Sequence, residues 1–448
     1  MAVITPFRAI RYNPAKVGSM EDVVTPPYDV IDDRAQAAFL AKNPYNMIQL
    51  DLSKRIGADA DGDRYDNARR LFGQWQADSV LLRDDEPALY LYFTEYLLPS
   101  GGRRIRKGFV SLVRLADFDR GIVKPHERTF ASVTDDRLRL MDTCQAQFSQ
   151  IFSLYSDPCN ELMAALESAR PETALCRVTD QDGCVHSLWR VTDRQILARV
   201  QAGFLDKALY IADGHHRYTT ALRLRDLERQ RNPSFNDAHP ANQVAMYLCP
   251  MEDPGLSILP THRLVRIPER LTVVDLAERL AASFELEEIS GGSREGLVEE
   301  VLGRMVEHGG SGRTSFGLYH PREDRCFLLR LRAGEMERHG AEIPAPLREL
   351  DVVVLSELVL HRLLELGHER CEAENLVDYF SDPDDALDVA VKEAGQDRPV
   401  TETLFLMNPT TVAQVRRVAD EGLIMPHKST YFYPKILTGL LVRPIAGD

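Results

Sequence analysis

Apolar positions recur along this chain with two different periods, which predict a mixture of helices and strands. Between residues 63 and 78 they follow helical spacing and would share one face of a helix. Runs rich in β-branched and aromatic residues at 88–95 and 108–115, separated by a Pro-Ser-Gly-Gly turn, predict two paired strands. By the same criteria we expect helices at 32–41, from Thr134 onward, and at 218–230, 271–283, 294–308, 351–364 and 410–420, and strands at 121–124, 208–212, 243–248, 256–259, 284–288, 315–319, 326–331 and 403–407. Together these elements predict an α+β fold, with mixed sheets and flanking helices.

The order of these elements predicts more than one domain, since 448 residues exceed what one ordinary core accommodates. Residues 1–85 are rich in turns and are expected to pack on a core formed by 86–268. The helix and strand pattern restarts near Leu271, which predicts a C-terminal α+β domain over 269–448. The last segment of that domain, 425–442, can return to the core.

Composition narrows the class of protein. The net charge of −14 argues against broad electrostatic affinity for nucleic acid or anionic membranes. The chain shows neither a signal peptide nor an apolar run long enough to span a bilayer. Its seven cysteines are an odd number and include no Cys-x-x-Cys pair, which disfavours a disulfide framework or a zinc cluster. We therefore expect a cytoplasmic protein whose partner is a small-molecule substrate rather than nucleic acid or a membrane.

The sharpest local signal is the segment Ala-Asp-Gly-His-His-Arg-Tyr, in which an apolar strand ends in Asp213 and Gly214. A helix follows at once, so its first N–H groups and the positive end of its dipole favour an anion at the turn. Arg217 adds a planar donor suited to phosphate oxygens. His215 and His216 can donate hydrogen bonds or transfer protons near neutral pH. The sequence therefore predicts a phosphate-binding loop.

The same loop has a simpler explanation, in which Asp213 caps the helix and the histidines occupy a polar turn. A metal site on the two histidines is disfavoured, because adjacent side chains usually point apart and no Cys pair or Glu-x-x-His partner accompanies them. We therefore expect no metal bound by the protein alone.

Other segments concentrate ionisable or aromatic side chains. In the sequence KPHERT, Glu127 is a possible general base, and His126 and Arg128 are possible anion ligands; the alternative is a solvated charged turn. The sequence MPHKSTYFYPK has charges and hydroxyls beside aromatic rings and can border a nucleotide or sugar-phosphate pocket, although an edge strand is equally compatible. Its candidate ligands are Lys428, Ser429, Thr430 and Lys435, and weaker pocket candidates are Tyr28, Asp29, Thr261, His262 and Arg263.

Together these segments resemble a bacterial and archaeal family called domain of unknown function 1015. The resemblance runs nearly end to end and rests on TPFRA (5–9), VTPPYDVI (24–31), PYN (44–46), PHERT (125–129), ADGHHRY (212–218), LPTHR (259–263) and MPHKSTYFYPK (425–435).

More distantly, GHHRY is similar to the phosphate-binding loop of the ParB and sulfiredoxin superfamily, which implies a core of that fold. The superfamily includes ATP-using sulfiredoxins, CTP-binding partition proteins and free-serine kinases. Sulfiredoxin-like members place a reactive Cys where this chain has His215, so sulfinic-acid reduction is not expected. Partition proteins carry a helix-turn-helix and a basic DNA-binding surface, and the sequence indicates neither.

The free-serine kinases resemble the chain best, because a Pro-His-Glu-type segment precedes an Asp-Gly-His-type loop. This resemblance implies that Glu127 is the catalytic acid/base and that Asp213 orients or deprotonates a substrate hydroxyl. The Gly214 loop, His216 and Arg217 would position and neutralise the phosphates.

We therefore expect a nucleotide-dependent phosphotransferase that uses ATP or ADP with Mg²⁺ and acts on a small hydroxyl metabolite, with free serine as one candidate. Walker and protein-kinase motifs are absent. Two alternatives remain: a phosphatase or nuclease that uses the same loop, and a non-catalytic nucleotide-sensing or binding protein.

Overall fold

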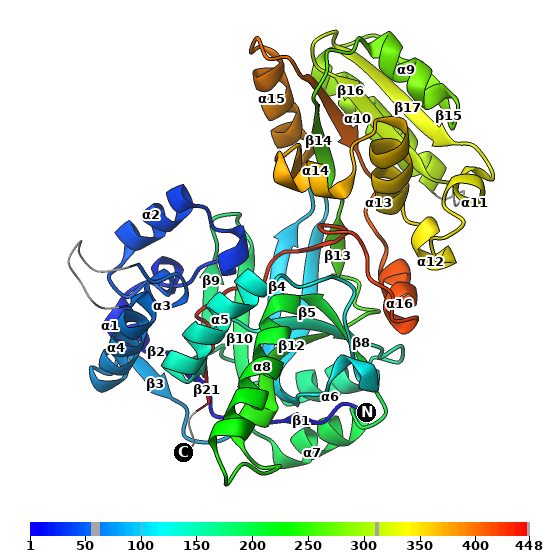
Figure 1. Ribbon diagram of the computed structural model, residues 1–448. Helices are drawn as coiled ribbons and strands as arrows, with labels where there is room; N and C mark the ends of the chain where they lie inside the picture. Colours follow the sequence, from blue (N-terminus) through cyan, green and yellow to red (C-terminus); the bar gives the residue numbers. More distant parts are fainter. Residues whose placement is uncertain (55–62, 100, 310–312, 446–448) are drawn as a thin grey trace. The chain divides into compact units, whose positions relative to one another are not determined.

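The computed structural model describes residues 1–54, 63–99, 101–309 and 313–445, which form two compact units. Unit 1 contains Met1–Ser257 and the chain from Pro434 onward, and unit 2 contains Ile258–Tyr433. The chain therefore leaves unit 1 once and returns to it near its end (Figure 1). These bounds differ from the three segments expected from the sequence.

Unit 1 is built on a mixed sheet that is nine-stranded over the described residues. Its strands, in spatial order, are β6 (Val123–Lys124), β11 (Leu209–Asp213), β8 (Ile151–Tyr155), β12 (Gln243–Pro250), β5 (Arg103–Arg114), β4 (Leu89–Leu97), β10 (Val185–Val191) and β9 (Cys176–Thr179), and β1 (Ile4–Thr5) also pairs with β5. The pairs β11–β6 and β12–β8 are parallel, and the other pairs in this sheet are antiparallel.

One face of this sheet is covered by the helices α6 (Glu161–Ser168), α7 (Arg194–Gly203) and α8 (His215–Arg231), which bury apolar side chains against it. Tyr218 of α8 is fully buried in this core, and its hydroxyl donates to the carbonyl of Ala116 at 2.7 Å. Helix α5 (Ala131–Cys144) lies beside α8 (Figure 1). Burial of Tyr218 therefore fixes the first turn of α8 at the end of β11.

The N-terminal part of unit 1 is made of short elements. These are β2 (Ile10–Tyr12), α1 (Pro14–Val17), η1 (Met20–Asp22), η2 (Tyr28–Val30), α2 (Asp33–Lys42), α3 (Ile48–Asp51), α4 (Arg64–Ala77) and β3 (Leu81–Arg83). The expected helices at 32–41 and 63–78 correspond to α2 and α4. The Asp32 side chain accepts a hydrogen bond from Ala35 N and so caps α2.

The returning C-terminal chain runs through unit 1 and is held along its length. Thr438 forms a β-bridge with Thr25, and Val442 forms one with Ile10. Strand β21 (Arg443–Pro444) pairs with β7 (Ala146–Gln147). This chain places Lys435 inside unit 1. The remaining elements of the unit are η3 (Phe118–Arg120) and η4 (Pro240–Asn242).

Unit 2 contains a six-stranded sheet, counted over its described residues, in the order β15 (Phe284–Ile289), β17 (Arg325–Leu331), β16 (Ser315–His320), β19 (Thr401–Leu406), β14 (His262–Ile267) and β18 (Val377–Phe380). Helices α10 (Arg294–Gly309) and α15 (Pro383–Ala394) pack on it. The other elements are β13 (Ser257–Leu259), α9 (Val273–Ala281), α11 (Glu335–His339), α12 (Ala345–Arg348), α13 (Asp351–Val353), the π-helical η5 (Val354–Leu363), α14 (His368–Ala373), α16 (Val412–Asp420) and β20 (Tyr431–Tyr433).

The α+β class is confirmed, and several element bounds need correction. The helix expected at 218–230 begins at His215, because Gly214 turns the chain directly into it. The helix expected from Thr134 begins at Ala131. Strand β8 was not predicted, since it is buried along its whole length and so lacks alternation. The helix expected at 351–364 is α-helical only at its start and continues as η5.

No helix in the described part of the chain combines the length and apolar character that a membrane crossing requires.

Candidate functional site

The predicted phosphate loop is a strand, one glycine and a helix. Strand β11 ends at Asp213, Gly214 adopts a left-handed φ of +93°, and α8 begins at His215. The first hydrogen bond within α8 runs from Tyr218 N to Gly214 O (3.0 Å), so the helix itself does not use the N–H groups before Tyr218. The N-terminus of a helix with this geometry can accommodate an anion.

Asp213 is held by two cationic side chains, one of them on α8, and not by backbone N–H groups of that helix. Its Oδ1 lies 3.3 Å from Lys435 Nζ, and its Oδ2 accepts from Arg217 Nη2. A register irregularity between Ile211 and Asp213 sets the side chain at the end of the strand. Burial by itself would raise the pKa of Asp213, but the charges of Lys435 and Arg217 outweigh burial and lower it. Asp213 is therefore an ionised carboxylate and does not cap α8.

Lys435 reaches this site because the chain around it is fixed at two points. The Arg106 guanidinium is fully buried and donates to the carbonyl of Pro434 at 2.6 Å. It also lies over the Phe152 ring, 4.8 Å from the centroid. On the other side of Lys435, Leu437 N donates to the Tyr92 hydroxyl at 3.1 Å. The backbone on both sides of the lysine is therefore bonded to unit 1, although Lys435 lies far from Asp213 in sequence.

Arg217 has a different place from the one expected. Its side chain is only 5% exposed, and it donates to the Asp213 carboxylate and to the carbonyl of Gln150. A Cβ at position 214 would lie 2.8 Å from Arg217 Nε, so the guanidinium fills the space beneath the glycine. The structure therefore places Arg217 beneath the loop, where it braces Asp213, and its contact with a phosphate stays a prediction.

The two histidines join the loop to the segment that carries Glu127. His215 Nε2 accepts from His126 N at 3.2 Å, and His216 Nε2 accepts from Phe130 N at 2.9 Å. Both contacts run from one short segment to the first turn of α8. Each Nε2 therefore accepts a backbone hydrogen bond, and the expected roles of the two rings at a phosphate stay predictions.

Glu127 lies beside the same turn, as its Oε2 is 3.7 Å from His215 Nδ1. Its side chain is 23% exposed, whereas that of His215 is 3% exposed. Burial lowers the pKa of His126 to about 4, and burial and the neighbouring His126 hold the pKa of His215 well below its ordinary value. Both imidazoles are therefore neutral near pH 7, and Lys435 and Arg217, rather than the histidines, supply positive charge at this end of β11.

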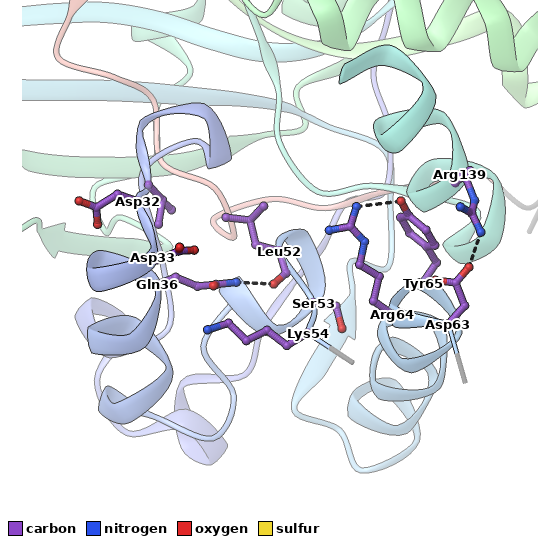
Figure 2. A pocket seen from close by; sticks show the side chains of 11 residues that line it. Asp32, Asp33, Gln36, Leu52, Ser53, Lys54, Asp63, Arg64, Tyr65 and Arg139 are labelled. Carbon is purple, nitrogen blue, oxygen red and sulfur yellow. Dashed lines mark hydrogen bonds and ion pairs between the residues drawn. The ribbon is translucent and has the colours of Figure 1, made fainter. Parts of the chain in front are cut away.

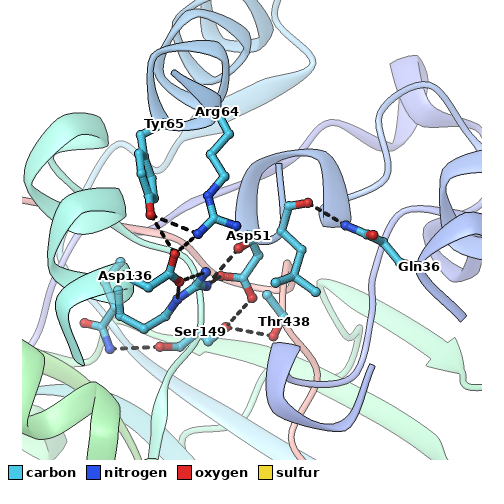
Figure 3. A network of polar contacts seen from close by, with 10 residues as sticks. Gln36, Asp51, Arg64, Tyr65, Asp136, Ser149 and Thr438 are labelled. Atoms are coloured by element: carbon cyan, nitrogen blue, oxygen red, sulfur yellow. Dashed lines mark hydrogen bonds and ion pairs between the residues drawn. The ribbon is translucent and has the colours of Figure 1, made fainter. Parts of the chain in front are cut away.

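Behind Arg217 lies a polar network that sequence reasoning missed. Arg137 donates to Asp51 Oδ1 (3.2 Å), Ser149 donates to Asp51 Oδ2 (3.2 Å), and Ser149 also bonds Thr438 (Figure 3). Burial raises the pKa of Asp51, and the Arg137 charge opposes that shift. Asp51 and Arg137 belong to no recognisable sequence motif. They come together only when α3 and α5 pack in the folded chain, so sequence reasoning could not pair them.

Tyr28 belongs to this network. The Arg137 guanidinium lies 4.3 Å from the centroid of its ring. Tyr28, Asp51, Arg137 and Arg217 line a cavity of about 30 Å³ that is large enough for one or two waters. The structure therefore places the candidate Tyr28 behind the phosphate loop, while Asp29 and Arg128 are exposed.

The candidates Thr261, His262, Arg263, Lys428, Ser429 and Thr430 belong to unit 2 and make contacts there. Thr261 Oγ1 donates to the Lys428 carbonyl at 2.9 Å, and the Ser429 carbonyl accepts from Thr410 Oγ1 at 2.8 Å. His262 Nδ1 accepts from Met407 N at 3.0 Å. Thus, of the C-terminal motif, Lys435 is the residue that the structure brings to the Asp213 loop within one unit.

A cavity of about 570 Å³ lies elsewhere in unit 1, between α2 and α4 (Figure 2). It is lined by Ile31, Asp32, Asp33, Gln36, Leu52, Ser53, Lys54, Asp63, Arg64, Tyr65 and Arg139. None of these residues belongs to the phosphate loop, and two of them, Lys54 and Asp63, directly flank residues 55–62, which lie outside the described structure. The volume of this cavity therefore does not identify it as a functional site. The side chains at the Asp213 loop are the stronger evidence for the location of the candidate site.

In the part of the chain that the structure describes, no group of three or more His, Cys, Asp or Glu side chains is placed to hold a metal ion. None of the seven cysteines, all of which lie in the described part of the chain, forms a disulfide. Burial raises the pKa of Cys144 and of Cys326 to about 12, so these two are protonated near neutral pH.

Comparison with known proteins places the chain in a family. Residues 4–353 match DUF1015, described as "Protein of unknown function (DUF1015)". This match covers well over half of the chain, so the chain belongs to that family, and the resemblance noted in its sequence is confirmed. No curated protein matches the chain.

Solved structures show weaker likeness. A free serine kinase variant in complex with AMP is 12% identical, with 72% of this chain and 91% of that chain covered and a TM-score of 0.34. A conserved hypothetical protein from Pyrococcus furiosus is 14% identical (73% and 94% covered, TM-score 0.33). SbnI with a C-terminal truncation, from Staphylococcus aureus, is 9% identical (75% and 87% covered, TM-score 0.33). These scores are too low to assign an activity.

Proposed function

We propose that this protein is a nucleotide-dependent phosphotransferase that acts on a small hydroxyl metabolite, with free serine as the first candidate acceptor. The observation that carries the proposal is one constellation within unit 1. A helix N-terminus behind Gly214, the Asp213–Lys435 ion pair and the Glu127 carboxylate all meet at the end of β11. Phosphoryl transfer needs this combination of an anion cradle and a nearby proton acceptor.

In the proposed reaction the acceptor hydroxyl attacks the terminal phosphorus of ATP or ADP. A new bond forms between the hydroxyl oxygen and phosphorus, while the bond from phosphorus to the bridging oxygen breaks. The bridging oxygen keeps the electron pair, so the nucleotide leaves as ADP or AMP. The hydroxyl proton passes to Glu127, which lies at the rim of the loop.

Lys435 and the first turn of α8 neutralise charge on the phosphates, and Asp213 holds Lys435 in place. The lowered pKa of Asp213 keeps its carboxylate ionised. The carboxylate can therefore accept a hydrogen bond from the substrate hydroxyl and orient that hydroxyl. We propose that Mg²⁺ enters with the nucleotide and is bound chiefly by its phosphates.

The proposal is tested by incubating the protein with Mg²⁺, ATP or ADP and a panel of hydroxyl metabolites that includes serine, and following phosphoryl transfer by ³¹P NMR. We expect a new phosphate monoester that requires both nucleotide and acceptor. Glu127→Gln should reduce turnover roughly a hundredfold while nucleotide affinity stays nearly unchanged. Glu172→Gln, at an exposed glutamate of unit 1, is the matched control and should behave as the wild type.

The two alternatives give different results in the same assay. A phosphatase or nuclease releases inorganic phosphate or cleaves a diester without ATP or ADP. A non-catalytic nucleotide sensor binds nucleotide, turns nothing over, and binds equally well after Glu127→Gln. Either pattern would refute the phosphotransferase proposal.

A further inference from the structure

The hydrogen bonds of His215 determine which of its ring nitrogens carries the proton. An imidazole nitrogen that accepts from a backbone N–H has no proton of its own, so in the neutral ring the proton is on the other nitrogen. His215 Nε2 accepts from His126 N at 3.2 Å. The proton of a neutral His215 is therefore on Nδ1, and Nδ1 is the atom that lies 3.7 Å from Glu127 Oε2.

The surroundings of His215 keep the ring neutral. The groups with the largest effect on its pKa are His126, Asp213, His216 and Arg217, the Glu127 carboxylate lies 3.7 Å from Nδ1, and the ring is only 3% exposed. Asp213 favours the charged ring, but burial and the neighbouring histidines and arginine oppose it and lower the pKa of His215. The neutral ring therefore offers the Glu127 carboxylate a single N–H donor and no full charge. Such a donor can orient the carboxylate without forming a strong ion pair.

We propose that His215 is a positioning residue for Glu127: anchored through Nε2 to the backbone of residue 126, it presents Nδ1–H to the Glu127 carboxylate and orients it toward the phosphate loop. The role of Glu127 as the base rests on the proposed function, whereas the contact between His215 and Glu127 does not depend on it. At 3.7 Å the pair is slightly longer than a hydrogen bond, and a movement on the order of 0.5–1 Å would bring it within N–H···O range.

The arrangement links the base to the phosphate site through one residue. His215 is the first residue of α8 and directly follows Gly214, so the turn that receives the phosphate also sets the position of the carboxylate. His216 is different, since its ring accepts from Phe130 N and stacks over the Phe130 ring with centroids 5.8 Å apart. The two adjacent histidines therefore anchor two points of the same segment, and His215 is the one that faces Glu127.

The first test reads the tautomer and needs no activity. In ¹⁵N-histidine-labelled protein, the imidazole signals that disappear in His215→Gln belong to His215. We expect them to report a neutral ring with the proton on Nδ1 near pH 7. A proton on Nε2, or a charged ring, would overturn the proposal.

The second test separates the two contacts of the ring with partial isosteres. In His215→Asn an amide nitrogen can take the place of Nδ1 and still donate to Glu127, whereas in His215→Gln the side chain reaches only the place of Nε2. Loss of the donor should raise the pKa of Glu127. A ¹³C-glutamate titration, with the Glu127 signal assigned through Glu127→Gln, should therefore show a higher pKa in His215→Gln than in the wild type, and a value near the wild type in His215→Asn.

The control for this titration is His239→Asn. His239 Nδ1 accepts a hydrogen bond from Ala241 N, and an asparagine oxygen can take the place of Nδ1, so the Glu127 titration should be unchanged.

If the protein transfers phosphate, His215→Gln should also lower kcat about tenfold or more and leave the nucleotide KM unchanged, while His215→Asn should restore most of kcat. Equal Glu127 titration in wild type and His215→Gln would overturn the positioning role. Absence of turnover in the wild type, with the tautomer and titration as expected, would count against the proposed function only.

Discussion

Lys435 and Asp213 are 222 positions apart in sequence and form an ion pair, with Lys435 Nζ 3.3 Å from Asp213 Oδ1. Both side chains are 14% exposed, so the pair is largely shielded from solvent. Since the chain leaves unit 1 at Ser257 and returns at Pro434, the site is completed only when the last segment has docked.

Replacing Lys435 by methionine should weaken the binding of phosphate-bearing ligands. A charge-assisted contact to phosphate contributes on the order of 1.5–3 kcal/mol, which corresponds to a loss of affinity of roughly tenfold to a hundredfold. Isothermal titration with ATP and ADP measures this loss. Lys16→Met, at an exposed lysine of unit 1, is the control. Equal affinity in the wild type and Lys435→Met would remove Lys435 from the ligand site.

Gly214→Ala should destabilise the fold more than a matched glycine substitution does. Gly214 has a φ of +93° and a new Cβ would lie 2.8 Å from Arg217 Nε, whereas Gly121 has a φ of +63° and nothing within 4 Å of a new Cβ. The left-handed backbone costs about 1–2 kcal/mol for alanine in both variants. Displacing Arg217 should add roughly 1–3 kcal/mol at position 214 alone.

Urea unfolding of the two alanine variants measures the difference in the free energy of unfolding. If Gly214→Ala and Gly121→Ala lose the same stability, Arg217 does not support the glycine as described.

The stability of unit 1 should fall as the pH falls from 6.5 toward 4. Burial lowers the pKa of His126 from 6.5 to about 4 in the folded chain. Within this window the unfolded chain binds the proton and the folded chain does not, so acidification favours unfolding, by on the order of 3 kcal/mol for this one group across the window. His215, whose pKa is also lowered by burial, contributes in the same direction.

His126→Gln removes one of these two titrations and should flatten the dependence of the unfolding free energy on pH in that window. Parallel curves for the wild type and this variant would show that His126 titrates normally in the folded protein.

Asp51→Asn should cost about 3 kcal/mol of stability, near the lower end of the range for breaking a buried ion pair. Arg137 is only 8% exposed and would lose the charge of the Asp51 carboxylate while it keeps the Asp51 carbonyl and its contact with Asp136. The matched control is Asp63→Asn, because Asp63 pairs with Arg139, which is 64% exposed. That pair should contribute less than about 1 kcal/mol. Denaturant unfolding of both variants distinguishes a supporting network behind the loop from an incidental contact.

The sequence by itself determined the features that depend on neighbouring residues. The period of apolar positions indicated the α+β class, and an apolar strand followed by Asp213 and Gly214 indicated a strand–turn–helix that the structure contains. These predictions succeed because backbone geometry and periodicity are local properties. Where burial removed the alternation, as in β8, the same reasoning missed the strand.

Only the tertiary structure decided which side chains meet. Arg217 was expected at a phosphate, and the structure pairs it with Asp213, because a buried carboxylate or guanidinium left without a partner would be strongly destabilising. The histidines were expected to act as donors, but the backbone N–H groups of residues 126 and 130 are brought to their Nε2 atoms by the approach of a segment more than eighty residues away. Such pairings depend on chain crossings and on shared burial, and no local pattern of residues encodes either.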